Sequence, residues 1–527
     1  MTHAGDNDES KVSRTEQIAA FLLPDIGDIL FILLLQIPLT LLPAFVFGDG
    51  STGWHITTGE YILQTHQIPH TDLISYTHPN DLWVAYEWLA DLFMALLVRA
   101  GGLNLLAVAA ASSVGLLMML LYHRCRKEGA HFSLVVFIAT IGVLIMAIHW
   151  LARPHLFVWL GVYLFYTRLE DFYRGAINHW KMLIPLALYM VLWVNVHPGF
   201  IFGLIILAIY LFSCLAQSIV FSNQAKPFLE KAKWIFLAMV ACAGAALINP
   251  YGFGLFGYIA NYLHGSKVLA ETGEFLSPVF HGQLQPTCLE ILFALLIFGL
   301  AFGARRLTLP TVLMCIAFAH LALSGLRNLP LFVIVSLPAI ARSWSGFSIG
   351  EGQLRFASLR ERLTRMTKLF DENEALCNKH IWPIAYCLIL VIAAVNGGSL
   401  AGQRVLNSSW SPKNKPIATL EYLRTAEKKG ELDANRGFNF DNWGGYIRYL
   451  LGTRVFIDDR ADFYGEKFYY EYGNVSLVQP GWQKILDDHK IQWVLFPKDS
   501  LLSAALSKTP GWQNVAQDEA SQLFVRK

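Results

Sequence analysis

Charged residues are scarce in this sequence. Asp, Glu, Lys and Arg make up 15% of its 527 residues, whereas about a quarter of a typical soluble domain is charged. Hydrophobic residues reach 54% and the mean hydropathy is +0.42. The composition therefore argues against a string of soluble domains and predicts an integral membrane protein.

Three further absences narrow the class of protein. The chain has no run of Lys or Arg and a net charge of only +2, so we expect no nucleic-acid partner. None of the seven cysteines lies after residue 397, so no disulfide framework holds the C-terminal region. The opening "MTHAGDNDESKVSRTEQ" lacks a signal-peptide cleavage pattern, and we expect the first apolar run to be retained as a membrane span.

Apolar runs recur along the chain, and most are long enough to cross about 30 Å of hydrocarbon. They cover residues 29–47, 103–122, 132–150, 155–167, 182–196, 199–220, 235–249, 288–304, 308–325, 329–344 and 380–396. A shorter apolar stretch, 86–98, carries Glu87 and Asp91, so we interpret it as a re-entrant or interfacial helix. The pattern predicts an α-helical membrane protein with about 11 transmembrane helices.

The positive charges predict the orientation of these helices. If the N-terminus is inside, the inner segments carry 20 Lys and Arg residues, and the outer connections up to residue 397 carry four. Basic residues are retained on the cytoplasmic side. We therefore expect a cytoplasmic segment 1–28, a transmembrane domain 29–396 with a first outer loop 48–102, and an extracytoplasmic domain 397–527. A bacterial inner membrane is the expected location.

The region 397–527 has the character of a soluble domain. Helical patterns at 416–430 and 500–508 alternate with strand-like stretches at 453–459, 491–497 and 521–527. Such alternation over about 130 residues predicts a compact C-terminal α/β or α+β domain.

Polar residues gather where the predicted spans reach the outer face. The stretch "FGDGSTGWHITTGEYILQTHQIPHTD", residues 47–72, holds three acids and three histidines, with no Lys or Arg. Ionisable groups at membrane depth are costly and usually face a cavity or one another, so we predict an outward-facing cavity. The residues expected to line it are Asp49, His55, Glu60, Glu87, Arg153, His155, His197, Asn249, Glu274 and Arg327.

These residue types suit a lipid-linked phosphate. The planar guanidinium groups of Arg153 and Arg327 could each pair with two phosphate oxygens, and a carboxylate beside them could accept a proton from an attacking hydroxyl. Asp49, between two glycines, is the main catalytic candidate, and Glu87 is the second. The remaining residues are predicted to bind substrate.

Each candidate also has a simpler interpretation. Asp49 could cap the helix that follows it, Glu87 could anchor the helix 86–98 at the interface, and the arginines could extend toward the headgroups. The histidines could be polar packing residues, because they show neither an HExxH motif nor a zinc-like i, i+4 pair. We therefore assign no metal ligands from the sequence.

The stretch "GDGSTGWHITTGEYILQTHQIPHTDLISYTHPNDLWVAYEWL" resembles the first outer loop of the GT-C superfamily. These polytopic glycosyltransferases use lipid-linked sugars, as protein O-mannosyltransferases and aminoarabinose transferases do. In the resemblance Asp49 matches the first-loop catalytic acid, and "GWHITTGEYIL" falls on the juxtamembrane helix. Asp49 is followed by Gly50 where most better-known members have a second acid. The motifs "ARPH", "VNVHPGF", "NPYG" and "RNLPLF" look like a bacterial branch of similar layout.

The resemblance implies a membrane glycosyltransferase that moves a sugar from a polyprenyl-phosphate carrier to a glycan, lipid or protein acceptor at the outer face. It implies no certain cofactor; Mg²⁺ or Mn²⁺ is the possible one. A lipid-linked glycan polymerase or ligase is the alternative enzyme. A transporter would place ionisable groups at mid-membrane, and a non-catalytic assembly protein would tolerate the loss of Asp49.

Overall fold

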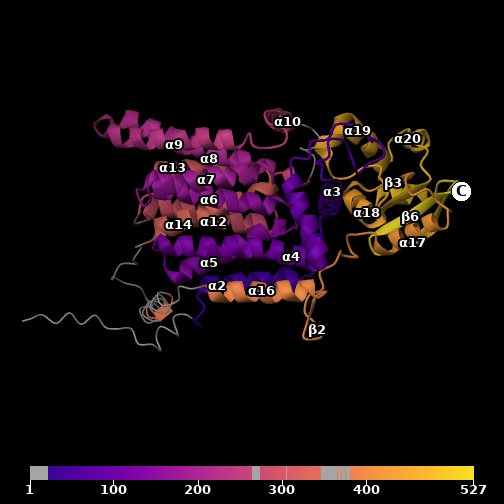
Figure 1. Ribbon diagram of the computed structural model, residues 1–527, viewed down its shortest axis with the longest axis horizontal. Helices are drawn as coiled ribbons and strands as arrows, with labels where there is room; N and C mark the ends of the chain where they lie inside the picture. Colours follow the sequence, from indigo (N-terminus) through magenta and orange to yellow (C-terminus); the bar gives the residue numbers. More distant parts are fainter. Residues whose placement is uncertain are drawn as a thin grey trace, which may run out of the picture.

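A bundle of apolar helices makes up the larger part of the molecule, and a smaller domain lies at one end of it (Figure 1). This computed structural model describes residues 22–263, 273–303, 305–345, 365, 369–370, 374 and 380–527. Most of the predicted cytoplasmic segment 1–28 and of the inner loop after residue 345 lies outside the described residues.

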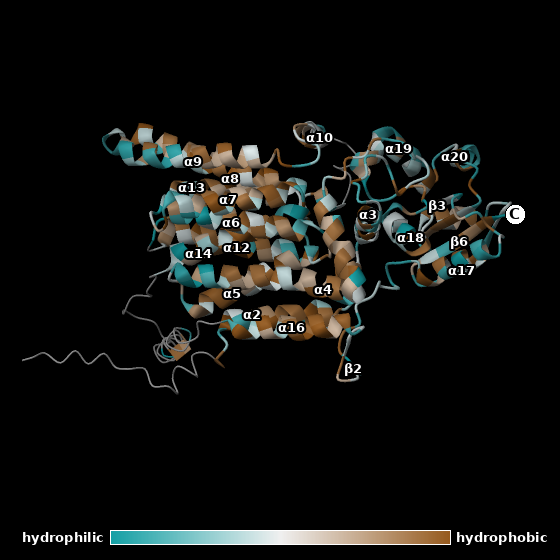
Figure 2. Ribbon diagram, viewed as in Figure 1, coloured by the Kyte–Doolittle hydropathy of each residue, from teal (hydrophilic) through white to brown (hydrophobic). Residues whose placement is uncertain are grey.

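Each of the predicted apolar runs contains a helix. The helices are α2 (Ile26–Gln36), α4 (Trp88–Lys127), α5 (Phe132–Met146), α6 (His155–Tyr173), α7 (His179–Val194), α8 (Ile201–Val220), α9 (Ala225–Ala245), α12 (Leu284–Phe302), α13 (Leu309–Ser324), α14 (Leu329–Trp344) and α16 (Ile381–Val395). Figure 2 shows apolar residues along the middle of the bundle and hydrophilic residues toward its ends. That distribution matches a belt of hydrocarbon around the helices.

Length and composition separate these helices into groups. Among the described residues, five are long and apolar enough to cross a membrane: Trp88–Lys127, Phe132–His149, Pro198–Val220, Leu284–Phe302 and Leu326–Trp344. Ile26–Leu41, His179–Val194, Leu309–Ser324 and Ile381–Val395 are shorter apolar helices. Charged residues occupy the last turns of α6 and the first turns of α9. The count of 11 crossings therefore stays a prediction.

The helix α4 consists of two helices joined at a break. Gly101 (φ −152°) and Gly102 (φ +62°) interrupt the helical backbone, and the positive φ of Gly102 lies in the region that glycine adopts readily. Residues 88–100 stand across the end of the bundle, whereas the rest of α4 runs along it (Figure 1). The stretch 86–98 is thus confirmed as a short helix separate from the run 103–122.

The smaller domain is built on a four-stranded sheet of order β3-β4-β6-β5. β3 (Gly437–Asn439) is parallel to β4 (Trp493–Pro497), while β6 (Ser521–Arg526) is antiparallel to both β4 and β5 (Trp512–Gln517). Its helices are α17 (Ile417–Lys428), α18 (Gly444–Leu451), α19 (Ala461–Ser476), α20 (Trp482–Asp488) and α21 (Leu501–Leu506). A hairpin of β1 (Ser399–Leu400) and β2 (Gln403–Arg404) joins α16 to this domain.

Most of the elements predicted for this domain are confirmed, and one is wrong. Helices form at 416–430 and 500–508, and strands at 491–497 and 521–527. The stretch 453–459 is not a strand of the sheet, because its backbone pairs with the first loop instead. Val455 accepts a hydrogen bond from the Tyr76 amide at 2.9 Å and donates one to the Ile74 carbonyl at 3.0 Å.

The first loop holds the smaller domain against the bundle. Its helix α3 (Ser51–Thr65) lies between the two and packs on α18 (Figure 1). A Cβ atom on Gly53 would lie 2.3 Å from the Gly445 carbonyl oxygen, so the two backbones touch directly. The buried guanidinium of Arg460 also binds Asp72 and Asp458, each at 2.7 Å. Residues of the two parts therefore meet around α3.

Candidate active site between the bundle and the C-terminal domain

Asp49 lies between the 3-10 turn Phe45–Phe47 and the start of α3. Its carboxylate is 3.1 Å from Nε of Arg153 and accepts a hydrogen bond from the Ser51 hydroxyl. The helix α3 has no side-chain cap, so the interpretation of Asp49 as a helix cap is wrong. Its side chain is 13% exposed, which leaves a ligand some access to the carboxylate.

Arg153 and Arg327 share one carboxylate, that of Glu274. Nη1 of each arginine lies 3.4 Å from a different Glu274 oxygen. Arg153 comes from the turn before α6, Glu274 from the turn Gly273–Phe275, and Arg327 from the turn Leu326–Asn328. Because both arginines make ion pairs, they do not simply extend toward headgroups. Together with Asp49, these three predicted residues form one continuous chain of opposite charges.

Positive charges keep Asp49 ionised. Burial raises the pKa of its carboxyl, but Arg153, the Ser51 hydroxyl and Lys415 outweigh this effect and hold the pKa at about 2. Lys415 belongs to the C-terminal domain, where its ammonium donates to the Asn442 carbonyl at 3.2 Å. Burial lowers the pKa of Lys415 to about 8, against the opposing pull of Asp49 and Asp459.

Glu87 occupies a second group of polar residues. Its two carboxyl oxygens lie 3.8 Å from Nε2 of His55 and 3.4 Å from Nε2 of His197. The other ring nitrogen of His55 is 2.5 Å from Asp91. Burial, together with the charge of Asp462, raises the pKa of Glu87 to about 8, although Arg153 and Arg327 oppose the rise. The region thus pairs an ionised acid with one that stays protonated at neutral pH.

Three predicted residues make their contacts elsewhere. Glu60 forms an ion pair with Arg99 at 2.5 Å. The Asn249 amide closes its own turn through the Ala246 carbonyl at 2.8 Å. Nε2 of His155 is 2.9 Å from the His149 carbonyl. Among the contacts that the structure describes, none joins Glu60 or Asn249 to Asp49 or Glu87.

The C-terminal domain contributes residues that were not among the predicted site residues. The indole of Trp54 donates to Asp459 at 2.9 Å. Burial raises the pKa of Asp459 well above its ordinary value, and the nearby charge of Asp49 raises it further. The stretch "DDRAD" at 458–462, with four charges in five residues, is the feature of the sequence that could have indicated a site residue here. Nothing in the sequence tied it to Asp49, because the two acids are about 400 residues apart.

A small cavity lies beside Glu87. Aromatic rings and ionisable groups share its lining, which includes Trp54, Trp83, Glu87, Asp91, Arg460 and Asp462. The Arg460 guanidinium lies 4.6 Å from the centre of the Trp83 ring, an arrangement in which the ring stabilises the cation. The cavity therefore opens between the first loop and the C-terminal domain, next to the second polar group.

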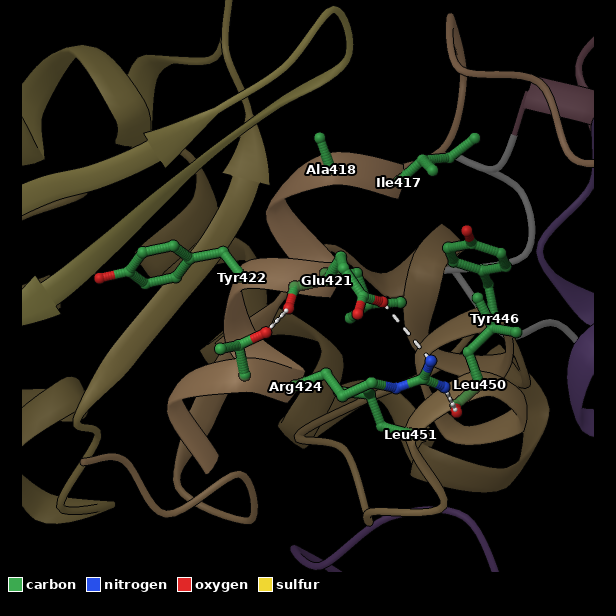
Figure 3. A pocket seen from close by; sticks show the side chains of 10 residues that line it. Ile417, Ala418, Glu421, Tyr422, Arg424, Tyr446, Leu450 and Leu451 are labelled. Carbon is green, nitrogen blue, oxygen red and sulfur yellow. Dashed lines mark hydrogen bonds and ion pairs between the residues drawn. The ribbon is translucent and has the colours of Figure 1, made fainter. Parts of the chain in front are cut away.

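A groove elsewhere on the C-terminal domain contains no predicted site residue. It runs between α17 and α18, with Ile417, Tyr446 and Leu450 among its lining residues (Figure 3). Arg424 reaches across it and donates to the Leu450 carbonyl at 2.6 Å. The groove is separate from Asp49 and Glu87, and we assign it no part in the chemistry below.

Asp49 and Glu274 are carboxylates of the kind that Mg²⁺ and Mn²⁺ bind, and Arg153 already contacts one oxygen of each. In the part of the chain that the structure describes, the one group of three metal-type ligands is Asp25, His123 and His380, in the bundle. No chemical step below is routed through a metal.

Comparisons with known proteins identify the fold. The sequence matches no protein-family profile and no curated protein. The oligosaccharyltransferase of Archaeoglobus fulgidus in its apo form is 13% identical, with 90% of this chain and 69% of that chain covered and a TM-score of 0.53. An oligosaccharyltransferase from the same organism, AglB, in complex with an inhibitory peptide and a dolichol-phosphate, is 13% identical, with 95% of this chain and 74% of that chain covered and a TM-score of 0.51.

A third solved structure overlaps less well. ArnT from Cupriavidus metallidurans, bound to undecaprenyl phosphate, is 10% identical, with 94% and 97% of the two chains covered and a TM-score of 0.47. The likeness to the archaeal enzyme confirms the predicted resemblance at the level of the fold. This chain therefore shares its fold with the oligosaccharyltransferase of Archaeoglobus fulgidus.

Proposed function

We propose that this protein is a membrane glycosyltransferase that moves a sugar from a polyprenyl-phosphate carrier to an acceptor at the outer face of a bacterial inner membrane. The observation that carries the proposal is the chain of charges from Asp49 through Arg153 and Glu274 to Arg327. It joins an acid suited to the acceptor with two guanidinium groups suited to a phosphate. The related fold of AglB, solved with a dolichol-phosphate, supports a lipid-linked donor.

The two arginines would bind the phosphate of the donor. Both are held at the end of apolar helices, so a phosphate could reach them while its polyprenyl tail stays beside the bundle. Each arginine already pairs with Glu274 at 3.4 Å, a distance longer than the 2.7–2.9 Å of a strong charged hydrogen bond. The donor phosphodiester carries one negative charge, as Glu274 does, and its two free oxygens could each accept from a guanidinium group.

Binding of the donor would also raise the pKa of the Asp49 carboxyl. With a pKa of about 2 it is a weak base, and general bases work best when their pKa is near the ambient pH. If the donor phosphate takes over Arg153, Asp49 loses its strongest positive neighbour while it remains buried, and its pKa rises. The donor would thus activate the base that the acceptor needs.

The transfer itself is an inverting displacement. The acceptor oxygen bonds to the anomeric carbon, and the bond from that carbon to the phosphate oxygen breaks. The electron pair leaves with the polyprenyl phosphate, which Arg153 and Arg327 stabilise. The proton of the acceptor hydroxyl goes to Asp49. Glu87, protonated near neutral pH, would orient the substrates from the neighbouring group.

The C-terminal domain would complete the site. We infer that Asp459 takes the part of the second acid that is missing next to Asp49, because the Trp54 indole holds it at the same α3 helix. Lys415 adds a positive charge near both acids. An acceptor would then bind between this domain and the first loop.

A transfer assay in reconstituted membranes tests the proposal. Radiolabelled polyprenyl-phosphate sugars would serve as donors, and extracted envelope glycolipids, glycans and peptides as acceptors. Loss of a general base typically costs 10²–10⁴-fold, so we expect Asp49→Asn to slow transfer by at least about 100-fold. Glu60→Gln is the matched control, because this acid on α3 is paired with Arg99 and should leave the rate unchanged.

Equal transfer by Asp49→Asn and Glu60→Gln would contradict the role of Asp49. Transfer of whole glycans from diphosphate-linked donors, with elongation of the product, would indicate the polymerase or ligase instead. Passage of the carrier across the membrane without transfer would indicate a transporter. A folded protein that rescues envelope assembly equally well with Asp49→Asn would indicate a non-catalytic assembly protein.

A further inference from the structure

Three helix ends meet at the end of the bundle opposite the C-terminal domain (Figure 1). Asp25 and Asp28 are at the start of α2, His123 is near the end of α4, and His380 directly precedes α16. The helices α2 and α16 both pack on α4, and this packing brings together side chains that are far apart in the sequence. The cluster shares no residue with the proposed transferase site.

One oxygen of Asp25 and one oxygen of Asp28 accept hydrogen bonds from backbone amides at the start of α2, and the other oxygen of each carboxylate does not. Oδ1 of Asp25 accepts a hydrogen bond from the Asp28 amide at 2.7 Å, and Oδ2 of Asp28 accepts one from the Asp25 amide at 3.3 Å. The remaining oxygens, Oδ2 of Asp25 and Oδ1 of Asp28, face the two histidines.

Asp25, His123 and His380 each offer one ligand atom, and these three atoms lie within 4.8 Å of one another, as the ligands of one metal ion do. Oδ2 of Asp25 lies 3.4 Å from Nε2 of His123 and 3.6 Å from Nδ1 of His380. Nδ1 of His380 is 2.9 Å from Oδ1 of Asp28. Zn²⁺ binds imidazole nitrogen and carboxylate oxygen at about 2.0–2.2 Å, which places neighbouring ligands of a tetrahedron roughly 3.3 Å apart. The measured spacings scatter around this value.

One ligand atom has no other partner. Nε2 of His123 is shielded from solvent and makes no hydrogen bond to the described residues. Buried polar atoms are normally satisfied, and coordination to a metal would satisfy this one. The absence of a side chain at Gly27 gives the imidazole its space, because a Cβ there would lie 2.5 Å from the same nitrogen. The side chains of His123 and His380 are 33% and 40% exposed, which leaves an ion a path to the cluster.

We propose that Asp25, His123 and His380 bind one divalent transition-metal ion, Zn²⁺, with Asp28 beside His380 at the edge of the site. Two imidazole nitrogens and one carboxylate oxygen are donors that Zn²⁺ accepts, and a water molecule can fill the fourth position of such a site. Such an ion fastens α2, α4 and α16 to one another and neutralises two carboxylates that lie at the same helix start. Its role is structural, and it is independent of any sugar transfer.

Metal content measured on the full-length protein in detergent tests the site. The protein is stripped with a chelator, incubated with ZnCl₂, freed of unbound metal and analysed for zinc per chain. We expect about one zinc in the wild type and a loss of most of it in His123→Gln and in His380→Gln. His131→Gln is the matched control, because His131 is exposed at the start of α5 and makes no capping bond there. It should bind as much zinc as the wild type.

A second measurement does not depend on how the variants fold. Co²⁺ in place of Zn²⁺ in the wild-type protein should give the intense visible absorption of a tetrahedral site, and ZnCl₂ should then abolish it. Zinc should also raise the unfolding temperature of the wild type and of His131→Gln but not that of His380→Gln. No zinc in the wild type, or equal zinc in all four proteins, would overturn the proposal and leave only hydrogen bonds between histidine and carboxylate.

Discussion

Glu87 is a carboxylic acid in a place where its charge is poorly solvated. Burial and the charge of Asp462 raise its pKa from 4.5 to about 8. The folded protein therefore keeps a proton that the unfolded chain releases above pH 4.5, and folding becomes less favourable as pH rises toward 8. The stabilising contribution of this proton is complete below pH 4.5 and is lost as the pH passes 8.

A pH series on Glu87→Gln checks this effect. The amide cannot ionise, so the variant should gain stability relative to the wild type by up to roughly 1.4 kcal/mol per pH unit between pH 5 and 8. The measurement is the unfolding temperature in detergent across that range. Glu60→Gln removes an acid that is paired on the surface and should give no such trend. Parallel curves for wild type and Glu87→Gln would show that Glu87 titrates normally.

Individual site residues were predictable from the sequence where membrane position constrained them. Asp49, Arg153 and Arg327 lie at predicted outer ends of spans and Glu274 in an outer loop, and a membrane confines such positions to one layer, so the sequence could place these residues at one face. Glu60 contacts neither Asp49 nor the arginines, because it lies 11 residues beyond Asp49, on the far part of α3. The contributions of Lys415 and Asp459 could not be predicted from the sequence, since no membrane layer fixes the positions of residues in a soluble domain.

The helices α3 and α18 are the elements that join the two parts of the molecule. A Cβ atom on Gly445 would lie 2.7 Å from the Gly50 carbonyl oxygen and 2.9 Å from the Trp54 ring. Backbone atoms cannot move away as a flexible side chain can, so Gly445→Ala should force α18 from α3. Overpacking of this kind costs about 1–3 kcal/mol.

We expect Gly445→Ala to lower the unfolding temperature and to speed the release of the C-terminal domain by trypsin. Gly473→Ala is the matched control, because a Cβ atom at this position in α19 meets nothing within 4 Å. Replacement of a glycine inside a helix by alanine gains up to about 1 kcal/mol, so this variant should be as stable as the wild type or more so. Equal digestion of both variants would show that the α3–α18 contact does not hold the domains together.

The elements themselves were predictable to different degrees. A long apolar run predicts a membrane helix, and every predicted run contains a helix. β3 spans only three residues, and β5 alternates weakly between partly buried and exposed positions, so neither gave a usable pattern. The stretch 453–459 has the composition of a strand, but its backbone partners belong to the first loop. Local composition indicates an extended backbone, yet it does not identify the partner.

At the scale of the whole molecule, charge is distributed unequally between the two ends of the bundle. The end opposite the C-terminal domain holds Arg124, Arg174 and Arg342, which pair with Asp171 or Glu128 at 2.6–3.1 Å. These arginines belong to the segments that the positive-inside rule assigns to the cytoplasm. The proposed sugar-transfer site and the proposed zinc site would then face opposite sides of the membrane.

Labelling of single cysteines in spheroplasts tests this orientation. Lys508→Cys adds an exposed thiol in the C-terminal domain, and Lys233→Cys adds one near the start of α9, at the other end of the bundle. A membrane-impermeant maleimide should label Lys508→Cys in intact spheroplasts and Lys233→Cys only after permeabilisation. Wild type gives the background, since five of the six described cysteines are buried. The opposite pattern would put Asp49 and both arginines on the cytoplasmic side, where an acceptor at the outer face could not reach them.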